Sequence, residues 1–144
     1  MDTMIRKFET SDMDQVLDIW LTASIKAHNF VEQSFWESEV DDMRDQYLPS
    51  GETYVYDDMG IVKGFVSLRG ETLEAVFVSP NAQGKGIGQQ LIAKAKELRA
   101  KLNLAVYKEN QNSLEFYKKC GFKIVGEQLN EHTGHPELLM ALNS

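Results

Sequence analysis

Cysteine is almost absent from this sequence, because its 144 residues include only Cys120. One thiol excludes an internal disulfide framework and a cysteine cluster for structural zinc. Long apolar runs are also missing, since no stretch approaches the ~20 residues that cross a membrane. The first residues lack the apolar centre of a secretory signal peptide. These absences predict a soluble protein of a reducing, cytoplasmic compartment, with no membrane partner.

Proline is scarce too, with 3 residues, while the 10 glycines are an ordinary share, and no residue type forms long runs. This excludes collagen-like, low-complexity and largely disordered chains. The hydrophobic fraction of 42% and the charged fraction of 26% are ordinary values for a globular protein. A chain of this length buries roughly two thirds of its unfolded surface without disulfides or metals. We therefore expect one domain over residues 1–144.

Basic side chains are in the minority, with 15 Lys and Arg against 22 Asp and Glu, a net charge of −7. Residues 1–72 carry 6 basic and 15 acidic side chains, whereas residues 73–144 carry 9 and 7. No basic stripe is present, so a nucleic-acid partner is not expected. Because the two halves differ in charge, the mildly basic C-terminal half could hold an anionic ligand and the acidic N-terminal half could attract a cationic one.

The first half of the chain predicts a strand, two helices and a meander of strands. The first strand is expected over 4–8, and the short side-chain oxygens of residues 10–12 suit a helix N-cap. Two stripes of residues at helical spacing follow and predict two helices: Val16, Leu17, Trp20, Leu21 and Ser24, then Trp36, Val40, Met43 and Tyr47. A loop over 26–30 is expected between these helices, and residues 49–51 should end the second one. Three short strands at hairpin spacing, over 53–56, 62–68 and 73–78, predict an antiparallel meander.

The second half predicts a strand, glycine loop and helix, followed by further strands. After Pro80 a glycine loop leads into a long helix, whose apolar face we assign to Ile87, Leu91, Ala95, Leu98 and Leu102. A short helix is expected over 112–119, with Gly121 as its left-handed C-terminal residue. Strands are expected over 104–107, 122–125 and 136–142. This is an α+β arrangement with a mixed sheet and a βαβ unit.

The glycine loop has the composition of an anion site. Three glycines at alternate positions leave backbone N–H groups uncovered, and the following helix adds its positive dipole end. A pyrophosphate suits such a loop. A Rossmann fingerprint would need glycine where Gln89 stands, and a P-loop would need Ser or Thr after Lys85, so both nucleotide motifs fail. A purely structural turn is the alternative.

Two motifs in order make the loop more specific. Gln83, Gly86 and Gly88 occupy the Q/R-x-x-G-x-G/A signature of motif A of the GNAT superfamily of N-acetyltransferases, which this segment resembles. The run 110–122 resembles motif B, N-x-x-A-x-x-F-Y followed by G-F, with Ser113 where alanine is usual. The loop with His28 and Phe30, followed by two aromatic residues, also resembles the YjaB/YiaC-type branch of small bacterial GNAT proteins.

This resemblance implies the fold and the donor substrate. The fold would be an α/β/α sandwich, with a mixed, largely antiparallel sheet of about 6–7 strands and about four helices on its two faces. Acetyl-CoA would be the co-substrate, held mainly by backbone groups. The residues implied in binding it are those at the end of one strand, those of the glycine loop and one asparagine: Phe77, Val78, Gln83, Gly84, Lys85, Gly86, Ile87, Gly88, Gln89 and Asn110.

The resemblance also implies the chemistry. Tyr117 matches the family tyrosine that protonates the CoA sulfur, and a phenol near pKa 10 can donate to a thiolate. A packing role is the alternative for this side chain. A strand N–H near Phe77 or Val78 would stabilise the oxyanion of the tetrahedral intermediate. The base is open between Glu74, which alternation places on one face with Val76 and Val78, and a relay of water molecules.

The acceptor site is expected at the loop between the first two helices. There His28 and Phe30 would line it, and His132 and His135 could face the same cleft. No metal site is expected, because the histidines lack ligand spacing. Cys120 is expected to be a packed thiol rather than a nucleophile.

The sequence therefore predicts an enzyme that transfers acetyl from acetyl-CoA to a primary amine by direct attack in a ternary complex. A cationic acceptor fits the acidic half, and the branch resemblance favours a protein lysine over a small polyamine-like amine. A non-catalytic acyl-CoA sensor on the same fold is the alternative, and a generic nucleotide-binding domain is disfavoured by the failed motifs. The protein could be a monomer or a homodimer.

Overall fold

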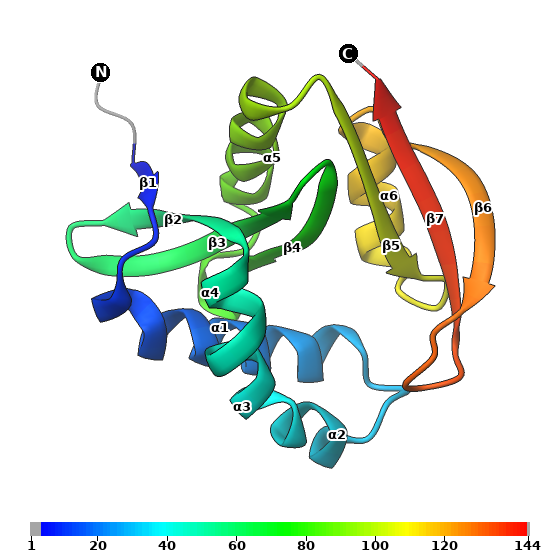
Figure 1. Cartoon of the computed structure of the whole chain (residues 1–144), viewed down its shortest axis with the longest axis horizontal. Coiled ribbons are helices and arrows are strands. Elements are labelled where there is room, and N and C mark those ends of the chain that lie inside the picture. Colours follow the sequence, from blue (N-terminus) through cyan, green and yellow to red (C-terminus); the bar gives the residue numbers. More distant parts are fainter. Residues whose placement is uncertain (1–3, 144) are drawn as a thin grey trace.

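The computed structural model describes residues 4–143, which form one seven-stranded mixed sheet in the order β1-β2-β3-β4-β5-β7-β6 (Figure 1). All neighbouring strands are antiparallel except β4 and β5, which are parallel. The strands are β1 Ile5–Lys7, β2 Glu52–Asp58, β3 Ile61–Arg69, β4 Thr72–Val78, β5 Lys101–Tyr107, β6 Lys123–Leu129 and β7 Pro136–Asn143.

The helices cover both faces of the sheet. They are α1 Met13–Ala27, α2 Gln33–Ser38, α3 Val40–Asp42, α4 Leu48–Ser50, α5 Ile87–Leu98 and α6 Gln111–Lys119, with a π-helical turn over Met43–Tyr47 and 3-10 turns over Thr10–Asp12 and Pro80–Ala82. Within residues 4–143 this makes four helical regions, namely α1, the run from α2 to α4, α5 and α6. The α+β sandwich expected from the sequence is confirmed.

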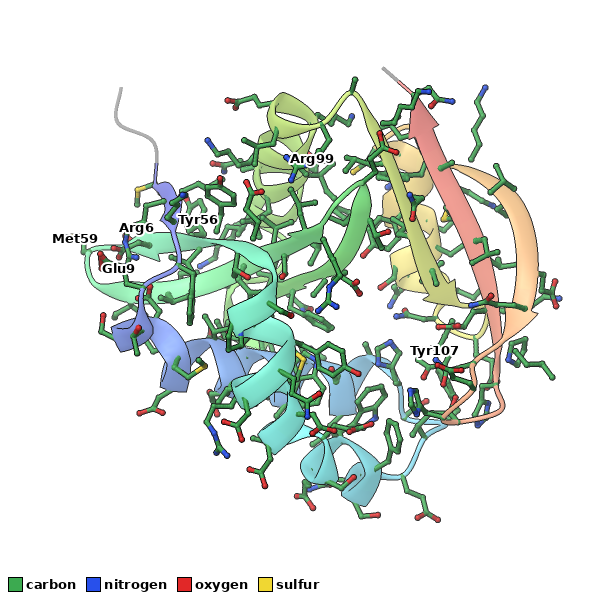
Figure 2. The ribbon with its side chains drawn as sticks, in the orientation of Figure 1. Arg6, Glu9, Tyr56, Met59, Arg99 and Tyr107 are labelled. Atoms are coloured by element: carbon green, nitrogen blue, oxygen red, sulfur yellow. The ribbon has the colours of Figure 1, made fainter. Side chains whose placement is uncertain are left out.

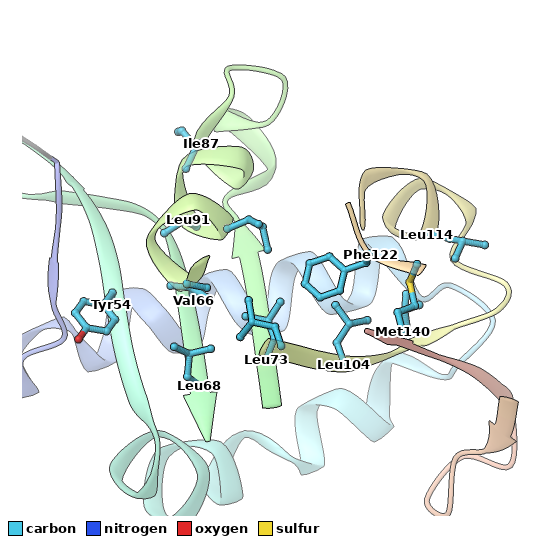
Figure 3. Packing of buried hydrophobic residues seen from close by; sticks show 14 of the residues in the cluster. Tyr54, Val66, Leu68, Leu73, Ile87, Leu91, Leu104, Leu114, Phe122 and Met140 are labelled. Carbon is cyan, nitrogen blue, oxygen red and sulfur yellow. The ribbon is translucent and has the colours of Figure 1, made fainter. Parts of the chain in front are cut away.

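Strand alternation divides the core into two clusters. Tyr54 and Val66 pack in the cluster beneath α5 and α6, which also contains Leu91 and Met140 (Figure 3). Val55 and Phe65, one residue away on the same strands, pack in the other cluster with α1 and α2. Because successive strand residues point to opposite faces, β2 and β3 contribute to both cores.

The predicted meander is confirmed. β2 and β3 join through Met59 and Gly60, whose φ angles of 54° and 91° are the left-handed values that a tight hairpin turn requires. The predicted βαβ unit is β4-α5-β5. Gly121 has φ 104° and follows α6, as expected for a C-terminal residue of this kind.

Three local predictions were wrong. Leu102 lies in β5, not on the helix face, because α5 ends at Leu98 and Arg99 is already extended. The second predicted helix, with Trp36, Val40, Met43 and Tyr47 on one face, is not one continuous α-helix. Helix α2 ends at Ser38, a π-helical turn separates α3 from α4, and α4 includes Pro49. The carboxylate of Asp12 does not cap α1: it accepts from the Glu9 N–H and from Arg6.

Ion pairs join the ends of distant elements. Arg6 donates to both carboxylate oxygens of the buried Asp12 at 2.9 Å and to Asp57 at 2.9 Å. Arg99 follows α5 and donates to Glu52 of β2 at 2.8 Å. Figure 2 shows Arg6 beside the β2–β3 hairpin and Arg99 alongside α5. These contacts hold β1 and α5 against the meander.

Candidate active site

A cleft of about 1110 Å³ opens where β4 and β5 separate. The two parallel strands are in register only at Thr72 and Asn103. The backbone N–H of Asn103 donates to the backbone carbonyl of Glu71 at 2.9 Å. Beyond that point both strands contribute residues to the cleft wall, from Leu73 to Val78 and from Leu104 to Tyr107. The edge of β4 that faces β5 is therefore open to backbone pairing with a ligand.

The glycine loop forms one end of the cleft. Gly84 and Gly86 have φ angles of 83° and 81°, which disfavour any residue with a side chain. Gly86 precedes the first turn of α5, and no side chain of residues 4–143 caps that helix. The N–H groups of Ile87, Gly88 and Gln89 belong to its unpaired first turn. The loop thus presents uncapped N–H groups and a positive dipole end to the cleft.

The remaining loop residues have different places. The Gln83 amide donates to the Val78 carbonyl at 3.2 Å and ties the loop to the end of β4. A Cβ at Gly88 would lie 3.1 Å from Cζ of Phe116, so this glycine permits the close approach of α5 to α6. Lys85 is exposed and is not among the residues that line the cleft, whereas Phe77, Val78 and the other loop residues are.

Helix α6 brings Asn110 and Tyr117 to the cleft. The Asn110 oxygen caps the helix by accepting the Ser113 N–H at 3.2 Å. The ring of Tyr117 packs edge-on against Phe116 and Phe122. No group among residues 4–143 hydrogen-bonds to the Tyr117 hydroxyl. Burial, with a smaller contribution from Cys120, raises the pKa of this phenol, so Tyr117 is protonated at neutral pH and able to donate.

His28 lies opposite, at the end of α1. It is buried, and its Nε2 is 3.2 Å from Nδ2 of Asn110. Because the Asn110 oxygen is occupied by the helix cap, its NH2 group faces His28, and Nε2 must be the acceptor. Burial lowers the pKa of His28 to about 4. His28 is therefore a neutral imidazole with its proton on Nδ1.

Aromatic side chains surround His28. Its ring centroid is 5.1 Å from that of Trp36, 5.0 Å from that of Tyr107 and 5.8 Å from that of Phe30. Figure 2 shows Tyr107 at the end of β5, near the loop that follows α1. Three buried polar atoms of this wall have no hydrogen-bond partner among the described residues: Ser24 Oγ, His28 Nδ1 and Trp36 Nε1. All three side chains line the cleft, but these three polar atoms are themselves buried behind its apolar surface.

Phe30 and His135 lie beside the cleft rather than in its wall. They line a neighbouring pocket of about 340 Å³, and their ring centroids are 5.1 Å apart. His135 Nδ1 is 2.8 Å from a carboxylate oxygen of Glu109. His132, by contrast, lines the main cleft. Of the four residues proposed for the acceptor side, the structure thus brings His28 and His132 to one cavity.

Glu74 is the extra residue of a β-bulge. Ser67 pairs with Ala75 and Leu68 pairs with Leu73, which leaves Glu74 without a partner on β3. The bulge breaks the alternation, so Leu73, not Glu74, shares a core cluster with Val76 and Val78. The prediction that Glu74 shares a face of β4 with Val76 and Val78 was therefore wrong. Its carboxylate is 3.5 Å from Nε of Arg69.

Glu137 is a cleft residue that the sequence analysis missed. It lies on β7 opposite Tyr107 and is only 9% exposed, yet it lines the cleft. Gln128 donates to one carboxylate oxygen at 3.1 Å and Asn130 to the other at 3.2 Å. No pattern in the strand 136–143 marks this residue, because a glutamate near a strand end is ordinarily exposed.

The structure adds little chemistry outside the cleft. Cys120 is half-buried in the apolar cluster, and burial raises the pKa of its thiol. Over residues 4–143, no three His, Cys, Asp or Glu side chains are grouped so as to hold a metal ion. None of the helices in that range is long and apolar enough to span a membrane.

Comparison with known proteins gives concordant matches. The family described as Acetyltransferase (GNAT) domain matches residues 49–124. The peptidyl-lysine N-acetyltransferase YiaC of Escherichia coli is 33% identical over 139 residues, 96% of this chain and 95% of that protein. The solution structure of apo YjaB from Escherichia coli superposes with a TM-score of 0.86 and 26% identity, covering 98% and 97% of the two chains. The PaiA N-acetyltransferase of Thermoplasma acidophilum, solved with coenzyme A, shares the fold with a TM-score of 0.82 and 16% identity over the whole of both chains.

Proposed function

Because the chain belongs to the GNAT family and is an acetyl-CoA-dependent N-acetyltransferase, we propose that it acetylates protein lysine side chains by direct attack in a ternary complex. The observation that carries this proposal is the cleft itself. One wall holds the glycine loop and Tyr117, the opposite wall holds His28 and Trp36, and a single cavity joins them. Donor and acceptor can therefore meet without a covalent enzyme intermediate.

The donor wall fits acetyl-CoA. The pantetheine amides pair with the open edge of β4 at Phe77 and Val78, which β5 leaves free. The pyrophosphate lies on the N–H groups of residues 83–89 at the start of α5, where Gly84 and Gly86 have no Cβ to obstruct it. The exposed Lys85 adds positive charge outside the cleft wall. Asn110 acts on this side by fixing the start of α6.

Two groups serve the transfer step. A backbone N–H near Phe77 or Val78 stabilises the oxyanion that forms on the thioester carbonyl, an effect worth about 3–4 kcal/mol per donor in studied enzymes. Tyr117 donates its proton to the departing CoA sulfur. Its hydroxyl suits this role because it lines the cleft, is protonated, and has no competing partner among residues 4–143.

The acceptor wall suits an alkyl amine. The rings of Trp36 and Tyr107 border a methylene chain. His28 is neutral, so it does not repel an ammonium group. Phe30 borders the neighbouring pocket and contacts residues that flank the acceptor. Protein lysine is preferred to polyamines because the relatives YiaC and YjaB carry the name peptidyl-lysine N-acetyltransferase.

The wider setting follows from composition. We take residues 1–144 as one GNAT domain that works in the cytoplasm, where acetyl-CoA is available and the single cysteine stays reduced. The net charge of −7 disfavours nucleic acid as a partner. A monomer and a homodimer are both compatible with the cleft, which is complete within one chain.

The test combines ligand-dependent stability with turnover. Acetyl-CoA at ~100 times its dissociation constant should stabilise the protein by about 2.7 kcal/mol. Thiol release is then followed with a lysine peptide, spermidine and an aminoglycoside as acceptors. Release that depends on the lysine peptide supports the proposal, and faster release with spermidine replaces lysine by a polyamine. Stabilisation without amine-dependent release would instead identify a non-catalytic acyl-CoA sensor.

A further inference from the structure

We propose that Glu137 binds the ammonium group of the acceptor and takes its first proton. This inference rests on the proposed amine acetylation and assigns the base that the reaction needs. A lysine amine with a pKa near 10.4 is almost entirely protonated at neutral pH, and an ammonium cannot attack a carbonyl. Either a side chain at the acceptor wall or a relay of water molecules must therefore remove a proton, and the surroundings of Glu137 favour the side chain.

Glu137 is placed on the acceptor side of the sheet. Its neighbours Leu138 and Met140 contribute to the core beneath α5 and α6. Tyr107, which faces Glu137 across the β5–β7 ladder, belongs to the core beneath α1 and α2 and contacts His28. The carboxylate therefore shares the wall that carries the proposed acceptor site.

The carboxylate is held in a fixed orientation. Asn130 accepts the N–H groups of His132 and Thr133 at its side-chain oxygen, at 2.8 and 2.9 Å, so its NH2 group must face Glu137. Gln128 fixes the second oxygen. Positioned amide donors of this kind keep a catalytic side chain in one rotamer.

Glu137 also has unused capacity for a cation. A carboxylate offers about four lone-pair sites, of which the two amides use two. None of the Lys, Arg or His side chains in residues 4–143 forms an ion pair with it. Removing a carboxylate from water without a cation is costly, so an ammonium entering the cleft is a favourable partner. Glu74, the other carboxylate considered, already has Arg69 at 3.5 Å.

The proton and electron balance is complete without a further reactant. An N–H bond of the ammonium breaks and its proton bonds to a Glu137 oxygen, which leaves the lone pair on nitrogen. That pair forms the bond to the acetyl carbon, the C–S bond breaks with its electrons on sulfur, and Tyr117 protonates the sulfur. The second amine proton returns to the Tyr117 oxygen through water, and Glu137 releases its proton to solvent.

The experiment compares two acceptors on the full-length protein. One is a lysine peptide, and the other carries an aminooxy group in place of the lysine ammonium, so that its nitrogen is neutral at neutral pH. In Glu137→Gln we expect kcat/KM for the lysine peptide to fall about 100-fold or more, the usual contribution of a general base. With the aminooxy peptide the loss should stay below about tenfold, because no proton has to be removed before attack.

Matched variants control for charge and folding. Glu127→Gln removes the same charge from exposed β6, where Glu127 pairs with Lys108 at 3.4 Å, and should leave both reactions unchanged. Acetyl-CoA affinity should stay within a few-fold of the wild-type value in each variant. If Glu137→Gln fails to fold, Glu137→Asp keeps the charge in a displaced position and should show the same selective loss to a smaller degree.

Three results would overturn the assignment. Equal losses with both peptides would reduce Glu137 to a structural residue, and unchanged kcat/KM would remove it from the reaction. Both leave the proposed function intact, because the wild-type protein still turns over. Failure of the wild-type protein to release thiol with any amine would instead overturn the proposed function, and the role of Glu137 with it.

Discussion

The side-chain amide of Asn110 donates a 3.2 Å hydrogen bond to Nε2 of His28, across 82 positions of sequence. The same amide caps α6 with its oxygen. One residue therefore fixes the start of the helix that carries Tyr117 and the tautomer of His28 in the proposed acceptor wall. This contact therefore joins the proposed donor and acceptor sides of the cleft.

Asn110→Asp should raise the pKa of His28 from about 4 by more than about one unit. Aspartate is as good an N-cap as asparagine, so α6 should remain intact. A carboxylate facing Nε2 favours the imidazolium, which the amide does not. NMR titration of the imidazole measures the change. Asn112→Asp adds the same charge at an exposed position two residues along the chain. An equal pKa shift of His28 in that variant would contradict the direct contact.

Tyr117→Phe should lower turnover about tenfold or more while acetyl-CoA affinity stays within a few-fold, because only the proton to sulfur is lost. The raised pKa of the phenol means that wild-type activity should not fall from Tyr117 ionisation as the pH rises through the usual phenol range near 10. Steady-state rates and isothermal titration with acetyl-CoA measure the two quantities. Equal turnover in the variant would exclude the acid role.

Gly86→Ala should weaken acetyl-CoA binding by about tenfold, equivalent to about 1.4 kcal/mol. The φ of 81° disfavours a side chain by about 1–2 kcal/mol, so the loop relaxes and its N–H groups turn away. Gly60→Ala is the matched control, since its φ is 91°, its surroundings are equally open, and it lies in the β2–β3 turn. Both variants should melt earlier, and comparable weakening of acetyl-CoA binding by Gly60→Ala would contradict the loop assignment.

Asp12→Ala should lower the free energy of unfolding by about 1.5–3 kcal/mol, because it removes charged hydrogen bonds to Arg6 and to a backbone N–H. The Arg6 guanidinium holds the pKa of Asp12 below its ordinary 3.8. The stabilisation is therefore fully present above pH 3.8 and is lost as the pH falls through the lower folded-state pKa. Thermal melts against pH should show the gap between wild type and variant closing only in acid. A gap that persists in acid would exclude the ion pair as its cause.

Much of the fold could be predicted because local rules operate there. The hairpin at Met59 and Gly60 follows turn chemistry, and the strands around it follow alternation. The errors lie where tertiary context decides. Leu102 keeps helical spacing with Leu98, yet Arg99 leaves the helix so that the chain can return as β5. The bulge at Glu74 has no signature of its own, because any residue can occupy it.

The site divides in the same way. The glycine loop and Tyr117 lie in short contiguous motifs, so sequence alone indicates them. Glu137 acquires its environment from Gln128 and Asn130 on the neighbouring strand and loop, and His28 from Asn110 on another helix. Such contacts depend on how the strands and helices pack. Burial of a carboxylate in a strand of ordinary composition cannot be deduced from spacing.

The divergence of β4 and β5 should weaken protection from amide hydrogen exchange in the middle of the sheet. Central strands are ordinarily the slowest to exchange, but here the fourth and fifth of the seven strands, β4 and β5, share one register pair, Thr72 with Asn103. The most protected amides should instead lie within the β2–β3–β4 ladders and the β5–β7 ladder, on either side of the gap. If acetyl-CoA bridges that gap, its binding should slow amide exchange on the facing edges of β4 and β5 together.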